Sequence, residues 1–471
     1  MLLLTKLLYA LPEISIILGI LHLSILCILS YESPKVYAKT ARLWLLVSLF
    51  SIIIFYDKSY NFQYFENTSY TMLMKSVIIF FSYIILIISP FWFSAENKTG
   101  YKFLVYIFLS IVTSSLLISS VNIISLLVSY IFLTYTNYRL INISSKEISN
   151  RHIKVSTVII FLMSLSFFYF YMQDDKIVGL NDLKYYILSK PNDFIVYIFS
   201  VFLLIPFLYL LGAAPFHLEK EDIQGKSILP VSHYFAIIIP IVSISLLIKL
   251  KETVFTGYEN NISFAFLIMG VFSIIFGALG ANSRINLHRI YAHGSMYHQG
   301  IVLILLSFFT PKADFSGFMY LLFYLVTLNG LYVVFYNLKS HGEFLSSQIS
   351  LSGLAQSRPN TTRALLIGIF SLLGIPPFTG FLAEFGFINE LLYEKSYLLL
   401  IVILVFFLIL SKSYLEIIKI SYFEQKIKSY DAENKTILLT TLFCMFLIII
   451  ISFNPWEIIE KIKDMFYVIY L

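Results

Sequence analysis

One pattern repeats along the sequence: a run of mainly apolar residues, then a short polar segment. A helix of about 20 such residues crosses the hydrocarbon core of a bilayer. Charged residues make up 13% of the chain, and a soluble surface needs roughly twice that share. The pattern excludes a soluble enzyme or nucleic-acid-binding protein and predicts an all-α, polytopic membrane protein. We expect about fourteen membrane helices, near residues 11–30, 41–56, 70–94, 101–119, 121–142, 154–172, 192–214, 229–250, 262–281, 287–309, 315–338, 363–393, 396–420 and 435–454.

Lysine and arginine gather in alternate loops, which gives the chain an expected orientation. Positive charge exceeds negative charge in residues 31–42, 139–154, 284–289 and 339–363, which follow the first, fifth, ninth and eleventh expected helices. Such loops stay on the cytoplasmic or matrix side of a membrane, so the odd-numbered loops should lie there. The segment after the seventh helix departs from this rule, and we expect a solvated loop that contacts another subunit. Its charged residues are Glu219, Lys220, Glu221, Asp222 and Lys226.

Two expected helices contain related interruptions. Leu211–His217 interrupts the seventh helix at Pro215, and Gly374–Gly380 interrupts the twelfth at Pro376 and Pro377. Proline and glycine free backbone groups that lipid cannot satisfy, so such breaks must be buried or hydrated. Paired breaks in corresponding positions indicate an inverted-repeat transporter whose ion path lies at the breaks. Ordinary proline kinks are the alternative interpretation.

Three segments around these breaks, and a weaker one near the N-terminus, carry a family pattern in the right order. They are Pro215-Phe216-His217 with Asp222 and Pro230-Val231; Phe276-Gly-Ala-Leu279 through His288-Arg289, Ala292, Ser295, His298 and Gly300; Leu351–Ala355, Pro359 and Ser371–Phe381; and, more weakly, Leu11–Ile14. In these residues the chain resembles the subunit 2 family of respiratory complex I, the antiporter-like membrane subunits of NADH:ubiquinone oxidoreductase. The match is strong from 205 to 385 and poor elsewhere.

The resemblance implies a fold and a place in a larger assembly. The fold would hold the N-terminal helices in 1–100, two inverted five-helix repeats in 101–250 and 251–420, and a last membrane helix with an amphipathic tail in 421–471. The chain would be a non-redox subunit of NADH:ubiquinone reductase, with NADH, FMN, iron–sulfur clusters and ubiquinone on other subunits. Expected partners are other membrane-arm subunits and lipids such as cardiolipin, not nucleic acid. No Gly-rich dinucleotide loop or cysteine cluster predicts a metal or cofactor on this chain.

Family members that pump protons use ionisable residues on helices 5, 7, 8 and 12. The helix-5 glutamate falls near Ile131, the helix-7 lysine on Leu210, and the helix-8 lysine on or beside Pro240. The helix-12 lysine falls on Glu384. Leucine, isoleucine and proline cannot bind a proton, whereas a buried lysine can exchange one. We therefore expect a subunit that keeps the fold and an assembly role but has a degenerate or rerouted proton channel.

A rerouted channel needs substitutes, because a buried ionisable group in a membrane segment is a functional hypothesis by default. Histidine in particular exchanges protons near neutral pH. Each candidate also has a structural alternative: binding of backbone groups freed at a break, side-chain packing, or snorkelling of a lysine to the interface. The candidates for proton transfer are Glu384, His217, His298, His293 and Lys412.

Several further expectations stay open at this point. A scaffold without proton transport is one alternative function; a free cation/proton antiporter subunit is another, although it should retain its buried lysines. Glu13 and Lys75 lie near helix ends, where we expect anchoring, and residues 456–470 form an amphipathic helix for the membrane interface or a neighbouring subunit. The 45 Phe and 34 Tyr suit the AT-rich codons of an organelle genome. We expect an organelle-encoded, multi-pass protein of the mitochondrial inner membrane.

Overall fold

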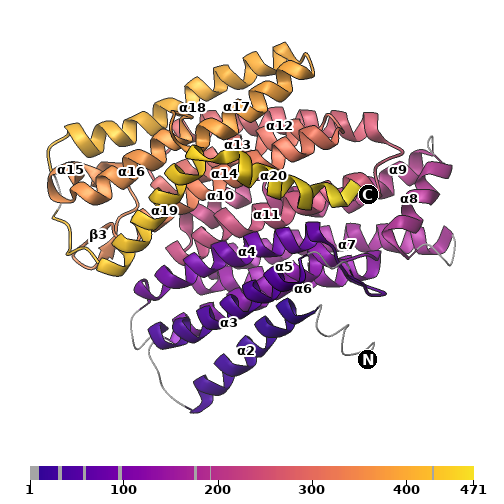
Figure 1. The fold of residues 1–471 in the computed structure, drawn as a ribbon, viewed down its shortest axis with the longest axis horizontal. Coiled ribbons are helices and arrows are strands. Elements are labelled where there is room, and N and C mark those ends of the chain that lie inside the picture. The colour runs from indigo at the N-terminus through magenta and orange to yellow at the C-terminus, as the bar shows by residue number, and fades with distance from the viewer. Residues whose placement is uncertain are drawn as a thin grey trace. The chain divides into compact units, whose positions relative to one another are not determined.

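The computed structural model describes residues 10–29, 34–56, 60–93, 98–173, 178–190, 193–426 and 429–470, and helices dominate it (Figure 1). The chain forms two compact units. Unit 1 consists of Met1–Leu211, Ile238–Ile262 and Ile462–Leu471, and unit 2 consists of Gly212–Ile237 and Ser263–Lys461. In the described ranges, eleven helices are long and apolar enough to cross a membrane. This confirms a polytopic all-α protein, while the number of fourteen spans stays a prediction.

Unit 1 contains the helices of the N-terminal part and one short hairpin. Its loops meet on one face, because Phe65 pairs with Ser120 and Asn122 pairs with Gly179 in antiparallel bridges. These residues belong to the loops after the second, fourth and sixth expected helices, as alternating spans require. The elements of unit 1 are α2 (Leu11–Leu29), α3 (Pro34–Phe55), β1 (Tyr60–Asn61), β2 (Glu66–Asn67), α4 (Ser69–Ile88), η1 (Ser89–Phe91), α5 (Lys98–Ser119), α6 (Ile123–Ser144), α7 (Lys146–Gln173), α8 (Leu180–Ser189), α9 (Phe194–Leu211), the second part of α11 (Leu229–Thr253) and η3 (Tyr467–Tyr470).

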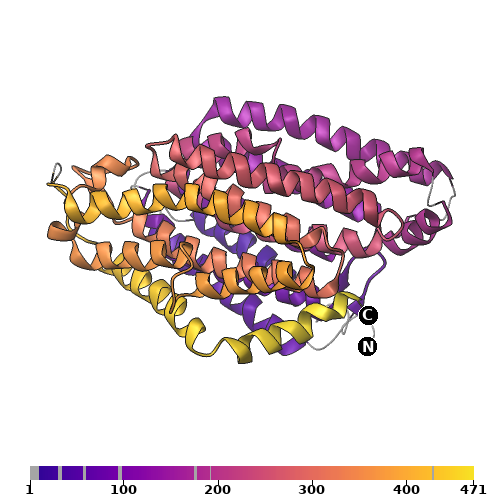
Figure 2. The ribbon, with the colours of Figure 1, turned by 90° about the horizontal axis from the view of Figure 1, so that it is seen from above.

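Unit 2 is a second helical bundle. The axes of its longer helices α13, α14, α17 and α18 run in roughly one direction in both views (Figures 1 and 2). Its elements are α10 (His217–Lys226), the first part of α11, most of α12 (Glu259–Asn282), α13 (Leu287–Leu306), α14 (Pro311–Phe335), β3 (Lys339–Ser340), β4 (Glu343–Phe344), η2 (Gln348–Leu351), α15 (Leu354–Ser357), α16 (Pro359–Leu372), α17 (Thr379–Tyr393), α18 (Tyr397–Phe423), α19 (Lys435–Phe453) and most of α20 (Pro455–Phe466).

The loops after the ninth, eleventh and thirteenth expected helices lie together on one face of unit 2. The Leu287 amide donates to Ser346 O at 2.7 Å, which joins the first two loops. Asp431 accepts the backbone amides of His341 and Gly342 at 2.8 Å, which joins the second and third. Two of these loops are the positive segments 284–289 and 339–363. We call this side of unit 2 the loop face, and the positive-inside rule assigns it to the cytoplasm or matrix.

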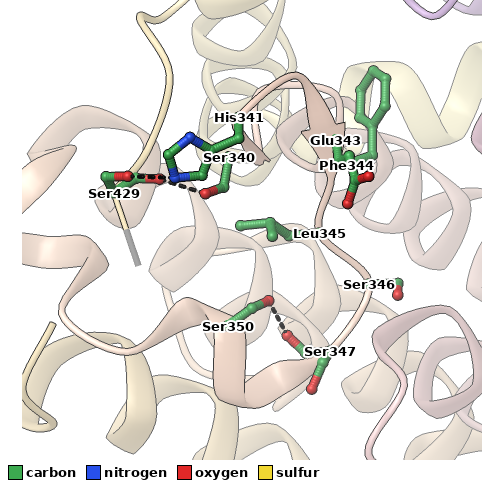
Figure 3. Close-up of a pocket in the computed structure, with 9 residues that line it drawn as sticks. All are labelled: Ser340, His341, Glu343, Phe344, Leu345, Ser346, Ser347, Ser350 and Ser429. Carbon is green, nitrogen blue, oxygen red and sulfur yellow. Dashed lines mark hydrogen bonds between the residues drawn. The ribbon is translucent and has the colours of Figure 1, made fainter. Parts of the chain in front are cut away.

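A cavity of about 480 Å³ opens among these loops (Figure 3). His341 and Ser340 point toward Ser429, and the Ser340 hydroxyl donates to Ser429 O at 2.6 Å. On the opposite wall the Ser350 hydroxyl donates to Ser347 O. The hydroxyls therefore bind loop backbone, and we assign the cavity to loop packing.

One expected element is wrong, and one expected helix is divided into two. Residues 217–226 are not a solvated loop but helix α10, in which Asp222 and Lys226 pair at 2.8 Å across one turn. The charge pattern alone did not reveal that the Ile223 side chain is buried against the unit. The expected helix 363–393 is split into α16 and α17. The short connection between α5 and α6 is as predicted, and the amphipathic tail begins as α20.

Candidate functional site

Two helix breaks in unit 2 share one local geometry. Gly212 has φ 69° and Gly374 has φ 65°, in the left-handed region that glycine adopts without strain. A cis peptide bond follows each glycine, before Pro215 and before Pro377. A serine hydroxyl accepts a freed amide at each break: the Ala214 amide donates to Ser273 at 2.9 Å, and the Gly380 amide to Ser371 at 3.1 Å. Each break therefore has one freed amide bonded to a side chain, while Pro215, Pro376 and Pro377 are exposed on the unit.

An ionisable side chain packs against the glycine of each break. A Cβ atom at Gly212 would overlap the side chain of Lys220, and one at Gly374 would overlap the carboxylate of Glu384. Lys220 belongs to α10 and Glu384 to α17, the helices that follow the breaks. Unit 2 thus holds a lysine at one break and a glutamate at the other.

Lys220 is a candidate residue that sequence reasoning missed. Its ammonium donates to Gln299 Oε1 of α13, and the Gln299 residue is 1% exposed. The mixed charges around Lys220 suggested a solvated loop. A better signal was its position: Lys220 follows Gly212 by eight residues, much as Glu384 follows Gly374 by ten. A helix that restarts after the break turns both side chains back over the glycine.

Glu221, next to Lys220, anchors a second group of charges. Its carboxylate lies 2.8 Å from Arg284, 3.5 Å from Arg289 and 3.2 Å from His293 Nε2. The Glu221 residue is 7% exposed, whereas the arginine side chains are 36% and 26% exposed. The acidic residues that broke the loop-charge rule are therefore neutralised by the positive loop 284–289. This explains why that segment carries no net positive charge on the loop face.

His298 and Glu384 line the same small cavity. The Nδ1 atom of His298 lies 2.7 Å from the hydroxyl of Tyr320, and the His298 ring stacks on Tyr324 with 4.2 Å between centroids. Tyr320, Tyr324 and Glu384 also line the cavity, together with the hydroxyls of Thr327 and Ser371. Its volume of about 10 Å³ is close to the space that one water molecule occupies. Imidazole, phenol and carboxylate therefore meet at a site with room for one bridging water.

These side chains form three contacting groups within unit 2, which together we call the polar series. Carboxylate, ammonium, imidazole and phenol each bind or pass a proton, and the amide of Gln299 binds the lysine. Glu221 contacts His293, Lys220 contacts Gln299, and His298 shares a cavity with Tyr320 and Glu384; the groups follow one another along α10 and α13. The members are Glu221, His293, Lys220, Gln299, His298, Tyr320 and Glu384.

One of the predicted candidates lies apart from the polar series. Lys412 is exposed on α18 and touches no member of the series among the described residues, which agrees with a side chain directed to lipid or a neighbour. The ring of His217 stacks on Phe276 with 5.2 Å between centroids, and His217 interacts electrostatically with Glu221, one helical turn further along α10. His293 contacts Glu221, and His298 shares a cavity with Glu384.

The lost family positions lie in unit 1 and are apolar in their surroundings. The Ile131 residue is 39% exposed on α6, whereas Leu210 and Pro240 are buried in α9 and α11. Pro240 stands inside α11 without breaking it. These three positions offer no proton-binding group, as the sequence predicted.

Unit 1 holds two buried lysine pairs away from these positions. The Lys75 ammonium is fully buried and bonds to Glu13 and to Asn67, so the expected anchoring at helix ends is wrong for this pair. Lys249 bonds to Glu66 at 2.6 Å and lies on a cavity of about 420 Å³. Sequence reasoning missed the first pair because its members are 62 residues apart.

Removing one partner of the Lys75–Glu13 pair should destabilise the protein. Lys75→Met leaves the Glu13 carboxylate buried without its cation, a loss of about 3–5 kcal/mol. Thermal unfolding of the detergent-solubilised protein measures this loss. The double variant Lys75→Met/Glu13→Gln should recover most of it, and Lys39→Met, at an exposed position of α3, should change nothing. Equal melting of Lys75→Met and Lys39→Met would contradict the role of the pair.

Comparison with known proteins agrees with this architecture. The chain is 30% identical over 264 residues to NADH-quinone oxidoreductase subunit N of Pelagibacter ubique, an alignment that covers 56% of each chain. It is 25% identical over 437 residues to the subunit N of Rickettsia bellii, covering 88% of this chain and 93% of the relative. Both relatives are bacterial.

Solved structures show the same fold at low sequence identity. A chain of respiratory complex I from Thermus thermophilus superposes with a TM-score of 0.80 at 16% identity, covering 95% of this chain and 98% of that one. A chain of the Mrp complex from Dietzia sp. superposes with a TM-score of 0.84 at 16% identity, covering 98% of both. The fold is therefore common to the two kinds of complex.

The family model described as NADH:quinone oxidoreductase/Mrp antiporter, TM, matches residues 121–411, which is more than half of the chain. That span includes both helix breaks and every member of the polar series. The chain belongs to the NADH:quinone oxidoreductase/Mrp antiporter transmembrane family.

Proposed function

We propose that this chain is a membrane-arm subunit of a proton-translocating NADH:quinone oxidoreductase, respiratory complex I. The observation that carries the proposal is the polar series, which holds Lys220 against one helix break and Glu384, with His298, at the other. Relatives named NADH-quinone oxidoreductase subunit N support the assignment to this complex. The chain contributes no redox step of its own.

Protons enter from the loop face. Arg284 and Arg289 open on that face and hold Glu221, whose carboxylate lies 3.2 Å from His293. Glu221, buried beneath these exposed arginines, is the first proton-binding group on this path. His293 is the next acceptor, since neutral imidazole binds a proton on one nitrogen and releases one from the other.

The centre of the series passes the proton to Glu384. His298 exchanges a proton with the Tyr320 hydroxyl at 2.7 Å, and the shared cavity has room for one water between these groups and the carboxylate. Lys220 supplies the ionisable amine that Leu210 cannot supply. Its hydrogen bond to Gln299, the residue after His298 in α13, holds the ammonium against that helix. The channel is in this sense rerouted through unit 2.

Electron transfer takes place elsewhere in the assembly under this proposal. NADH, FMN, iron–sulfur clusters and ubiquinone would be bound by other subunits, and within the described residues no group of His, Cys, Asp or Glu forms a metal-binding cluster. Partners would be the other membrane-arm subunits and lipids such as cardiolipin. Apolar side chains exposed on α18, among them Leu398, Ile401 and Leu408, offer surface for such neighbours.

A structural scaffold is the second candidate function. Apolar Ile131, Leu210 and Pro240 favour it, because they leave unit 1 without the ionisable groups that pumping relatives use there. The scaffold would keep the membrane arm sealed and would move no protons. The number of protons moved per electron distinguishes the two functions.

We place the protein in the mitochondrial inner membrane, encoded by the organelle. The abundance of Phe and Tyr supports this assignment through codon composition. A bacterial plasma membrane is the alternative, since both relatives above are bacterial. Hybridisation of the gene to purified organelle DNA, against nuclear or bacterial chromosomal DNA, tests the assignment.

Purification of the tagged chain from its native membrane tests membership of the complex. The expected result is one large assembly that oxidises NADH with quinone and, in proteoliposomes, moves protons as it does so. Recovery of an assembly without NADH oxidation that exchanges cations for protons in an imposed gradient would contradict the proposal. That outcome would favour a free antiporter subunit.

A further inference from the structure

Glu390 is a buried carboxylate that the polar series does not include. It lies on α17 six residues beyond Glu384, about 9 Å along the helix axis. The residue is 2% exposed. Its Oε1 atom is also buried, and among the described residues it has no hydrogen-bond partner. A buried carboxylate with an unsatisfied oxygen is costly unless it binds a proton or a cation.

The cation that Glu390 faces comes from the surface. Lys312, the second residue of α14, places its ammonium 3.4 Å from Glu390 Oε2, although the lysine side chain is 58% exposed. This separation exceeds the usual hydrogen-bond range of about 2.7–3.2 Å. One loose contact with a solvated lysine therefore balances the buried charge.

Lys312 contacts a second group at the same time. Its ammonium lies 3.8 Å from the centroid of the Tyr393 ring, within cation–π distance, and that ring is exposed. The lysine can stay over Tyr393 or move into water while its contact with Glu390 lengthens. Glu390 thus has a partner that leaves without any rearrangement of the helices.

Both residues lie at the membrane side opposite the loop face. Lys312 follows the connection after the tenth expected helix, and Glu390 precedes Lys395 in the connection after the twelfth. These are even-numbered loops, which the loop charges assign to the outer side. Glu390 therefore lies closer to the outer side than Glu384, and Lys312 is exposed at that side.

We propose that Glu390 is the last proton-binding residue before the outer surface and that Lys312 controls when it releases its proton. With Lys312 withdrawn, the Glu390 carboxylate takes the proton that Glu384 gives up. When Lys312 returns, its charge stabilises the Glu390 anion, and the proton passes to outer water. Glu390 gains one proton from Glu384 and releases one proton to outer water in each cycle. The inference rests on the proposed function and adds the point at which the proton leaves the protein.

The test measures protons moved per electron in proteoliposomes that contain the assembled oxidoreductase. Glu390→Gln should lower this ratio as much as Glu384→Gln does. Glu390→Asp, which keeps a carboxylate, should retain most of the normal ratio. Lys312→Met should lower the ratio of protons to electrons too. Because the Lys312 side chain is exposed, this substitution should not disturb folding. Glu394→Gln and Lys395→Met, at the same end of α17, should leave the ratio unchanged.

The outcomes separate the two proposals. A normal ratio in Glu390→Gln or Lys312→Met, with a lowered ratio in Glu384→Gln, overturns the outlet and leaves the polar series standing. A normal ratio in all of these variants overturns the proposed function itself. If Glu390→Gln does not assemble, Lys312→Met and Glu390→Asp decide between the same outcomes.

Discussion

Glu384→Gln should abolish proton movement through this subunit while the complex continues to oxidise NADH. Glutamine keeps the size and the hydrogen bonds of the glutamate but cannot bind a proton at physiological pH. Glu384 lines the cavity that it shares with His298 and Tyr320, so no neighbour replaces it there. A positioned proton-transfer group is worth about 10²–10⁴-fold in rate, and the flux through this subunit should fall by at least about 10²-fold.

The ratio of protons moved to electrons transferred measures this change in proteoliposomes. NADH oxidation in the presence of an uncoupler serves as the control for assembly, and it should stay near the normal rate. Glu416→Gln is the matched control variant, because Glu416 is exposed on α18. A normal ratio in Glu384→Gln would favour the scaffold function over proton transport.

Lys220→Met should produce a loss of similar size. Methionine retains the packing over Gly212 but removes the ammonium that bonds to Gln299. The polar series then lacks the Lys220 amine at the first break, together with the charge and the proton that this amine carries. We expect a fall of about 10²-fold or more in proton flux through the subunit, measured as the same ratio.

Lysine 226 offers the control on the same helix. Lys226→Met removes an exposed ammonium paired with Asp222 across one turn of α10, and the proton ratio should not change. Lys220→Arg keeps the charge with a bulkier head group and should retain part of the flux. Equal ratios for Lys220→Met and Lys226→Met would show that the break lysine has no part in transport.

Local signals in the sequence predicted the two breaks and their neighbours correctly. Glycine with proline inside an apolar span has few structural explanations, and Pro215 and Pro377 lie where that signal placed them. Glu384 was also predicted as an ionisable group near a break. The same holds for His298, whose position on α13 follows from simple helical counting.

Tertiary partners were beyond the reach of these signals. Glu221 looked like part of a solvated loop because Arg284 and Arg289, which neutralise it, lie more than sixty residues away in the chain. Lys220 was missed for the same reason, since Gln299 is 79 residues distant. Glu390 drew no attention because its burial depends on α14, a different segment of the sequence.

The locations of the lost family positions help to decide between a rerouted channel and a scaffold. Ile131, Leu210 and Pro240 all lie in unit 1, whereas every member of the polar series lies in unit 2. Glu221 is buried, and Lys220 and Glu384 are half-buried. A chain that had lost proton transport altogether would gain nothing from holding these three charges away from water, because doing so is costly in a membrane protein. Their retention in one unit supports a rerouted channel over an inert scaffold.

A cryo-EM map of the assembled complex, at a resolution that shows ordered water, tests the central claim most directly. The account predicts water or side-chain contacts within about 3.2 Å of one another from Glu221 through His293 and His298 to Glu384. It also predicts a water in the cavity beside Tyr320. A dry gap between His298 and Glu384, with no water and no side chain within reach, would contradict proton transport by this route.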